Sequence, residues 1–266
     1  MVKKNKIVAI VQARLSSKRF PKKIFKKINN VSIIDLINKR LQNCKYLDDI
    51  VYAIPLNKEN NELYNHLKKR GCKIFRGDEN NVLDRFYKSA KKFNADTIVR
   101  VTSDCPLIDP KMVDRLVKIF NKSKVDYLTN TKDPNFNKDF FFYPDGLDIE
   151  IFSFSSLKKI KNYSLTEFHK QHVSSFLRYS DKFKKLYIKQ KKVYKNLKLS
   201  VDDEKSLKNI KKIFNFFYPN IYFSYNDIIK KKLFEKFFKK DLILQSKTKN
   251  LSTSLKLCTV AHQITH

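Results

Sequence analysis

Short apolar runs alternate with longer amphipathic stretches along the first half of the chain. The runs are rich in Ile and Val, as in strands buried on both faces, and cover residues 7–11, 49–54, 73–76 and 97–101. The stretches between them have helical spacing, at about 33–41, 58–70 and 82–93. This alternation predicts an α/β fold over residues 5–130, with an open, mainly parallel, Rossmann-like sheet and flanking helices.

Single residues mark the ends of several predicted elements. Pro55 ends the second strand, and Gly71 is placed to stop the helix over 58–70. Asp109 followed by Pro110 is the signature of a helix start, because Asp caps the free amides and Pro fits the first turn.

The regular alternation ends after residue 130. A loop is expected over 131–137, followed by strands over 140–143 and 148–152, helices over 154–161 and 165–178, a strand over 197–201 and a helix over 203–217. We therefore expect one domain over 1–240, with a small inserted β/α region at about 135–185 for substrate binding or dimer contact. Residues 241–266 lose periodicity and are expected to form an accessory or ill-ordered tail.

The charge of the chain is high but evenly spread. The 266 residues carry 57 Lys plus Arg against 26 Asp plus Glu, a formal net charge of +31, and 48 of the cations are Lys. Lysines fall on nearly every segment, which is typical of solvated faces, whereas nucleic-acid readers favour Arg for bidentate contacts. A basic nucleic-acid-binding protein is therefore only an alternative, and no specific nucleic-acid partner is expected.

Glycine and cysteine exclude several kinds of site. Only Gly71, Gly77 and Gly146 are present, too few for a Walker A loop or a GxGxxG fingerprint, so any phosphate must be bound largely by side chains. The four cysteines form no C-x-x-C pair, so the sequence suggests neither a zinc knuckle nor a disulfide framework.

The apolar run near the start has five residues, too short for a signal peptide or a membrane span. A cytoplasmic protein with no membrane partner is the expectation.

The loop over residues 11–23 is the most informative segment. It directly follows the first strand, where open α/β sheets bind ligands. Its two Arg, three Lys and two Ser can surround a triphosphate with charge-assisted hydrogen bonds. The alternative is a basic surface loop in a basic protein.

Six residues of this loop fit the pattern A-R-x-x-S-x-R-x-P-x-K, namely Ala13, Arg14, Ser17, Arg19, Pro21 and Lys23. The pattern resembles the N-terminal signature of the sugar cytidylyltransferases, or CMP-sugar synthetases. The resemblance continues in the same order along the chain in four further motifs. These are 75–78 together with 82–85, then 100–109, 143–150 and 199–202. It covers about residues 6–218 and is closest to the branch named after spore-coat polysaccharide biosynthesis protein F. Lys22 and Asn30 stand where many relatives have Gly, and Ser103 where sister groups have Gly.

The resemblance implies a nucleotide-diphospho-sugar transferase fold and a Mg²⁺-dependent nucleotidyltransferase that is a homodimer. Its reaction would transfer CMP from CTP to an acidic or modified sugar and release pyrophosphate, for surface polysaccharide or glycan biosynthesis. The residues implied to bind the nucleotide are Ala13, Arg14, Ser17, Arg19, Lys23, Asp84 and Arg85. Those implied to bind Mg²⁺ are Asp104 and Asp202, and those implied to be catalytic are Arg14, Lys23 and Asp104. Those implied to contact the sugar are Asp145, Asp148, Glu150 and His172.

Structural alternatives accompany several of these residues. Asp104 or Asp202 could instead cap a following helix, although Asp203 is a rival cap. Asp84 and Arg85 could have a purely structural role at a helix start instead of contacting the nucleotide. His169 and His172 lie three residues apart on one predicted helix, but no third ligand is evident. A glycosyltransferase on a related fold is the second enzyme hypothesis, although no clear D-x-D element stands at a strand end.

Overall fold

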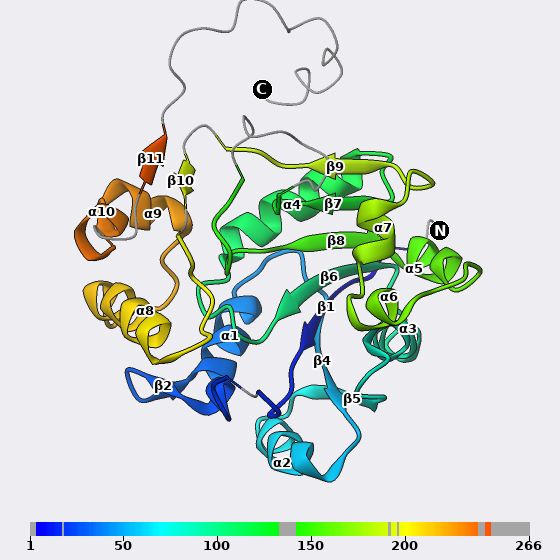
Figure 1. The fold of residues 1–266 in the computed structure, drawn as a ribbon, viewed down its shortest axis with the longest axis horizontal. Helices are drawn as coiled ribbons and strands as arrows, with labels where there is room; N and C mark the ends of the chain where they lie inside the picture. Colours follow the sequence, from blue (N-terminus) through cyan, green and yellow to red (C-terminus); the bar gives the residue numbers. More distant parts are fainter. Residues whose placement is uncertain are drawn as a thin grey trace, which may run out of the picture.

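The computed structural model describes residues 4–17, 19–132, 142–190, 193–195, 197–238 and 243–245. Its centre is a seven-stranded sheet in the order β5-β4-β1-β6-β8-β7-β9 (Figure 1). The strands are β1 (Ile7–Gln12), β4 (Asp49–Pro55), β5 (Lys73–Gly77), β6 (Thr97–Thr102), β7 (Tyr127–Thr129), β8 (Glu150–Ser153) and β9 (Lys185–Tyr187).

The sheet is mainly parallel, as the sequence predicts. Strand β1 pairs in parallel with β4 and β6, and β4 with β5. Strand β8 is antiparallel to both β6 and β7, and β7 is parallel to β9. Register places Gln12 beside both Ala53 and Thr102, so β1, β4 and β6 end at the same edge of the sheet. We call this the carboxyl edge.

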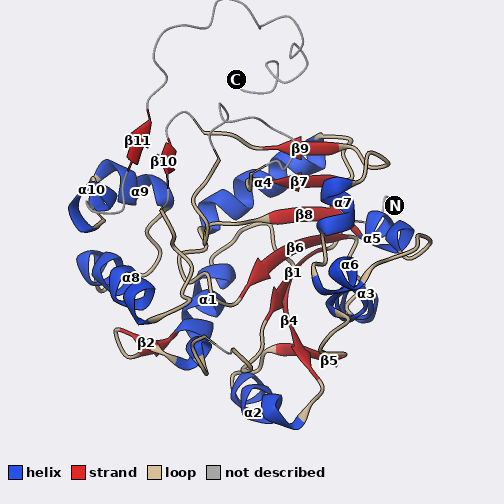
Figure 2. Ribbon diagram, viewed as in Figure 1, coloured by secondary structure: helices blue, strands red, loops and turns tan. Residues whose placement is uncertain are grey.

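Helices cover both faces of the sheet (Figure 2). The apolar side chains of β1 alternate between the two faces, because successive side chains of a strand point in opposite directions. Ile7, Ala9 and Val11 belong to one buried core, and Val8 and Ile10 to the other. The first core includes α1 (Ile33–Gln42), α2 (Asn61–Lys69), α4 (Pro110–Lys122) and α8 (Glu204–Phe217). The second includes α3 (Val82–Lys92), α5 (Phe154–Ile160) and α7 (Ser175–Tyr179).

The remaining elements are short. They are α6 (Glu167–Gln171), α9 (Tyr225–Lys230), α10 (Leu233–Phe237), two 3₁₀ turns (Lys23–Phe25 and Lys58–Asn60), and two hairpins made by β2 (Lys27–Ile28) with β3 (Val31–Ser32) and by β10 (Val193–Lys195) with β11 (Ile243–Gln245). Among the described residues, no helix has the length and apolar character needed to span a bilayer.

The predicted helix start at Asp109 is confirmed. The Asp109 side chain accepts a hydrogen bond from the Lys111 amide at 2.9 Å, and Pro110 is the first residue of α4. The single helix expected over 165–178 is instead two, α6 and α7. The chain leaves helical geometry at His172, which places Val173 in the second core. Burial of Val173 explains why the helix is interrupted.

The predicted strand over 197–201 does not form. The amides of this segment bind loops at the carboxyl edge instead, Leu199 N–H donating to the Asp145 carbonyl at 2.7 Å and Val201 N–H to the Asp104 carbonyl at 2.8 Å. Of the strand predicted over 140–143, residues 142 and 143 are not in a strand, and 140–141 lie outside the described residues. The predicted tail over 241–266 contains β11, and its other residues lie outside the described ones.

Candidate active site

A cavity of about 480 Å³ opens at the carboxyl edge of the sheet. Seven residues predicted for the nucleotide or the metal line it: Ala13, Arg14, Ser17, Arg19, Lys23, Asp104 and Asp202. The other lining residues are Gln12, Ser16, Glu79, Thr102 and Ser103. The structure therefore brings together side chains that are up to 189 positions apart in the chain, between Ala13 and Asp202.

The loop after β1 is anchored by alternate residues. Ala13 and Leu15 are buried, and the Leu15 amide donates to Asn60 Oδ1 at 2.9 Å. Arg14 and Arg19 are exposed as a consequence. Ile24 is buried in the core directly after Lys23, which fixes the backbone that carries this lysine.

Two positions near this loop adopt backbone geometry that favours glycine. Lys22 has φ 51° and Asn30 has φ 63°, both in the left-handed region. An L-residue with a Cβ there costs about 1 kcal/mol relative to Gly, and Asn tolerates it best. The chain makes both turns with residues other than glycine, Lys22 and Asn30.

Lys23 lies between two carboxylates. Its Nζ is 2.8 Å from Asp104 Oδ2 and 3.0 Å from Asp202 Oδ1. Asp202 also pairs with Lys198, and with Arg19 at 3.4 Å. Burial alone would lower the pKa of Lys23, but the two carboxylates raise it.

The same contacts keep both carboxylates ionised. Burial alone would raise the pKa of Asp104, but Lys23 lowers it below its usual range. For Asp202, hydrogen bonds from Lys198 and Lys23 outweigh burial and lower the pKa to about 2. Both side chains are therefore anionic near neutral pH.

The helix-cap alternatives for these two residues are excluded. Helix α4 is capped by Asp109, and α8 by Asp203, whose Oδ1 accepts from the Ser206 amide at 2.7 Å. Asp104 and Asp202 are thus both free to face the cavity.

The pair of carboxylates fits a magnesium ion that is shared with a substrate. Oxygens of Asp104 and Asp202 both lie within hydrogen-bond distance of the same Lys23 nitrogen, so they converge on one point. Within the described ranges, no cluster of three His, Cys, Asp or Glu could hold a metal. Mg²⁺ commonly uses one or two carboxylates, water and substrate phosphates, which agrees with this donor set.

A turn over 145–148 packs directly against the segment that carries Asp202. Gly146 has φ 96°, and a Cβ there would lie 2.3 Å from the Leu199 carbonyl carbon. Ser200 Oγ is 3.0 Å from Asp145 Oδ2 and 3.4 Å from Asp202 Oδ2. Two of the residues predicted to bind the sugar, Asp145 and Asp148, are therefore close to the predicted metal ligands, although neither lines the cavity.

The carboxyl group of Asp148 lies close to that of Asp145. Burial is the main reason why the pKa of Asp148 is raised to about 7, and the neighbouring Asp145 carboxylate adds to it. Glu150 and Cys105 are the next acidic groups nearby. Titratable carboxyl groups with such shifts are typical of substrate-binding regions.

Glu150 and Asp84 lie away from the cavity, contrary to the predicted contacts. Glu150 is buried, and its oxygens accept from Arg100, from Tyr127 and from Ser174 Oγ at 2.6 Å, so it has no free face for a sugar. Asp84 instead faces Lys88 at 2.7 Å and Lys161 at 3.6 Å.

Arg85 is buried behind the cavity lining. It donates to the carbonyl oxygens of Asp78 and Glu79, and burial followed by repulsion from Arg14 lowers its pKa to about 10. Its placement supports the loop after β5 and does not contact the cavity directly.

The two predicted histidines lie on α6 and at its end. His172 is exposed, and its pKa is lowered by partial burial and by Arg100. The Nδ1 atom of His169 is 3.0 Å from Thr166 Oγ1, as part of a helix cap. This explains why the two histidines form no metal site with other described residues.

Several residues in or beside the cavity are not predicted as site residues from the sequence. Gln12 and Ser103 lie inside the motif segments 11–23 and 100–109, at or directly after the ends of β1 and β6, and this position at a strand end is the signal that identifies them. Arg100 donates to Gln12 Oε1 at 3.1 Å, a diagonal contact across β1 and β6 that needs the strand register. Glu79 and Lys198 lie in loops, and no spacing in the sequence indicates their neighbours.

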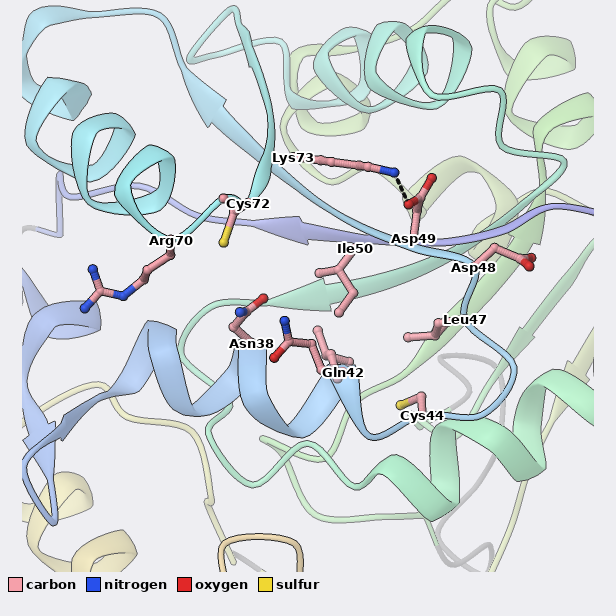
Figure 3. A pocket seen from close by; sticks show the side chains of 12 residues that line it. Asn38, Gln42, Cys44, Leu47, Asp48, Asp49, Ile50, Arg70, Cys72 and Lys73 are labelled. Atoms are coloured by element: carbon pink, nitrogen blue, oxygen red, sulfur yellow. Dashed lines mark hydrogen bonds and ion pairs between the residues drawn. The ribbon is translucent and has the colours of Figure 1, made fainter.

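A second cavity of about 230 Å³ lies at the opposite edge, where β4 and β5 begin (Figure 3). Asp49 and Lys73 form an ion pair beside it. Cys44 and Cys72 also line this cavity, and burial raises the pKa of both thiols, which makes them poor nucleophiles. None of the predicted site residues lines it.

Comparison with known proteins identifies the family to which the chain belongs. The sequence profile of the cytidylyltransferase family matches residues 8–238. A protein of Methanocaldococcus jannaschii without a characterised function is 32% identical over 206 residues, 76% of this chain and 81% of that protein. The spore coat polysaccharide biosynthesis protein SpsF of Bacillus subtilis is 31% identical over 127 residues, 46% of this chain and 53% of that protein.

Solved structures show the same architecture. A cytidylyltransferase from Leptospira borgpetersenii superposes with a TM-score of 0.78 at 28% identity, covering 92% of this chain and 99% of that one. A CMP:2-keto-3-deoxy-manno-octonic acid synthetase with bound CTP shares the fold, with a TM-score of 0.59 at 15% identity and coverage of 80% and 100%. The chain therefore belongs to the cytidylyltransferase family and is an enzyme of the nucleotidyltransferase class.

Proposed function

We propose that the protein transfers CMP from CTP to an acidic or modified sugar, with release of pyrophosphate, for polysaccharide or glycan biosynthesis. The observation that carries this proposal is the convergence of Lys23, Asp104 and Asp202 in one cavity, beside Arg14 and Arg19. Cations and carboxylates that face the same space suit a magnesium-bound triphosphate.

In this reaction a sugar hydroxyl oxygen bonds to the α-phosphorus of CTP and loses its proton to water, while the bond from that phosphorus to the pyrophosphate oxygen breaks. Negative charge develops on the leaving and non-bridging oxygens. Arg14, Arg19 and Lys23 would bind these oxygens and stabilise their charge. Since these side chains come from one anchored loop, little reorganisation is needed when the charge develops.

Asp104 and Asp202 would hold Mg²⁺, which when bound supplies further neutralisation of phosphate charge. Their carboxylates remain ionised because Lys23 and Lys198 lower their pKa values, so the two ligands need not lose protons first. Asp145 and Asp148 would bind hydroxyls of the sugar next to these ligands, joined to Asp202 through Ser200.

The choice of CTP and of an acidic sugar is supported by the relatives. The family is named for cytidylyl transfer, and several curated relatives are named 3-deoxy-manno-octulosonate cytidylyltransferase, including one of Christiangramia forsetii that is 26% identical over 150 residues. The SpsF match adds polysaccharide biosynthesis as a setting.

Two measurements test the proposal. Thermal unfolding with CTP, UTP, GTP or ATP, each with Mg²⁺, is expected to show the largest stabilisation with CTP, because a ligand stabilises the folded state that binds it. Incubation with CTP, Mg²⁺ and a panel of acidic sugars is expected to release pyrophosphate with one of them. No release with any sugar, together with CTP binding that is indifferent to Asp104→Ala, would refute the proposal. Preferred binding of an intact nucleotide sugar over CTP would favour a glycosyltransferase.

We also propose a homodimer that uses the region around α6 and α7. Phe168 and Tyr179 are each 49% exposed there, and their rings are 6.4 Å apart. Exposed neighbouring aromatic rings favour burial against a partner surface. Light scattering of the wild type and of Phe168→Glu would test this, since the variant is expected to be monomeric. A cytoplasmic location remains the prediction from the sequence.

A further inference from the structure

Glu79 is an acidic side chain in a cavity that otherwise suits phosphates. It lies in the loop after β5, is half-buried, and lines the cavity with Arg14 and Lys23. Ser16 Oγ donates to its Oε1 at 2.9 Å, and Asn57 Nδ2 donates to its Oε2. Both donors are neutral.

The other two acids of this cavity are neutralised by cations. Asp104 and Asp202 share Lys23, whereas Glu79 forms no ion pair with any other described residue. A carboxylate has about four acceptor positions, and the two recorded donors leave capacity for more. Glu79 therefore offers a charged acceptor to whatever occupies this end of the cavity.

The loop that carries Glu79 is fixed from behind. Arg85 is buried and donates to the carbonyl oxygen of Glu79 at 3.3 Å and to that of Asp78. Asp78 in turn accepts from the amides of Asn80 and Asn81, at 2.7 and 2.6 Å. A Cβ at Gly77 would lie 3.1 Å from Arg85 Cγ, so this glycine permits the close approach. The position of Glu79 is thus set before a ligand arrives.

The strand order separates Glu79 from the predicted metal ligands. Glu79 follows β5 and Asp104 follows β6, and these strands lie on opposite sides of β1 and β4 in the order β5-β4-β1-β6. If phosphates occupy the end at Lys23, Asp104 and Asp202, the nucleoside lies toward Glu79. A phosphate next to Glu79 would be repelled, because both are anions and acceptors. The donors of cytidine are its ribose hydroxyls and the exocyclic amine of its base.

We propose that Glu79 accepts a hydrogen bond from a donor group of the nucleoside, either a ribose hydroxyl or the base amine, and so distinguishes a nucleotide from a bare polyphosphate. The proposal rests on the proposed function, because it needs a nucleoside triphosphate in this cavity. In this proposal Glu79 contacts the substrate, and Arg85 is a positioning residue that holds the loop carrying Glu79.

The test compares Glu79→Gln with the wild type by calorimetric titration of CTP, UTP, 2′,3′-dideoxy-CTP and inorganic tripolyphosphate, all with Mg²⁺. Gln keeps an acceptor oxygen and the size of the side chain but removes the charge. Glu167→Gln is the matched control, because it removes the same charge from an exposed side chain on α6. Thermal unfolding without ligand checks that both variants are folded.

The expected result is a loss of CTP affinity of about 10-fold in Glu79→Gln, since the hydrogen bond loses its charged acceptor. Tripolyphosphate affinity is expected to stay the same or rise, because an anion has left the cavity. If CTP is weakened and UTP is not, the donor is the base amine. If CTP and UTP are weakened equally and dideoxy-CTP is unaffected, the donor is a ribose hydroxyl.

An unchanged affinity for all four ligands, or an equal loss for all four including tripolyphosphate, would overturn the proposal and leave Glu79 as a structural link between loops. A wild type that binds tripolyphosphate but no nucleoside triphosphate would instead overturn the proposed function. The two failures are therefore distinguishable in the same set of titrations.

Discussion

The two cavities lie at opposite edges of one sheet, and both contain an aspartate paired with lysine. At the amino ends of β4 and β5, Asp48 pairs with Lys4 and Asp49 with Lys6 and Lys73, and the Lys73 side chain is 51% exposed. At the carboxyl edge, Lys23 joins two aspartates that come from distant segments, and its side chain is only 15% exposed. The two edges therefore differ in the convergence of two carboxylates on one shielded lysine, and this convergence is why we propose the carboxyl edge as the functional one.

The sharpest test of this comparison is a pair of aspartate variants. Asp104→Asn is expected to lower kcat for pyrophosphate release by about 1000-fold, because a charged ligand to Mg²⁺ is replaced by a neutral one. Asp49→Asn, at the other edge, is expected to change kcat by less than about twofold. The comparison fails if both variants lose activity alike, or if Asp104→Asn retains full activity across a Mg²⁺ titration.

A pair of glycine variants is expected to have the next largest effect. Gly146→Ala would place a Cβ 2.3 Å from backbone atoms of Leu199 and Ser200, in addition to the strain at φ 96°, so we expect a loss of about 3 kcal/mol in the free energy of unfolding. At Gly71, which lines the other cavity at φ 67°, a Cβ meets nothing within 4 Å, and Gly71→Ala should cost about 1 kcal/mol.

Urea unfolding of the two glycine variants measures both numbers. Equal losses would mean that the turn over 145–148 has no special contact with the segment before α8. A loss confined to Gly146→Ala should be accompanied by weaker CTP binding, because Asp202 follows that segment.

Two lysine variants separate specific binding from bulk charge. Lys23→Met is expected to weaken CTP binding by about 30-fold, since it removes a half-buried cation that we propose binds the triphosphate. Lys73→Met removes the same charge at the other edge and should weaken binding less than about twofold, by reducing the net charge alone. Titrations at two salt concentrations check this, because the small effect of Lys73→Met should disappear at high salt while that of Lys23→Met persists.

A further expected effect is a pH dependence of stability that comes from Asp148. Its folded pKa of about 7 is above the usual carboxyl value, so the folded state holds a proton that the unfolded state has lost. The stabilising contribution is complete below about pH 4 and disappears as the pH rises through 7. Asp148→Asn removes this dependence.

Melting temperatures of the wild type and of Asp148→Asn, measured from pH 4 to pH 8, test the sign. The free energies of unfolding derived from these melts should change in favour of the variant as the pH rises, by at most about 4 kcal/mol, because a rise of the pKa from 3.8 to about 7 sets this upper limit. A difference that is constant across this range would show that Asp148 is not perturbed.

The first half of the fold was predictable because its strands are buried on both faces and therefore read as continuous apolar runs. The loop over 11–23 is identified by its position after the first strand and its cations, and Asp104 and Asp202 by the resemblance; residues of the loop and both aspartates line one cavity. Asp84 and Glu150 were misplaced because the sequence does not show which neighbour takes a carboxylate: Lys161 and Ser174 reach them from the region after β8. Strands β7 and β9, with three residues each, are too short for a periodic signal.

The bridge that Lys23 makes has a consequence for the order of binding. The Lys23 ammonium group lies at the point on which Asp104 and Asp202 converge, so a divalent cation held by these two carboxylates would have to compete with a lysine. A triphosphate bound in the cavity would attract the same lysine and release the two carboxylates. If the proposed function holds, we expect weak binding of Mg²⁺ by itself and strong binding of the Mg²⁺–nucleotide chelate. The enzyme would then respond to the concentration of the chelate more than to that of free metal.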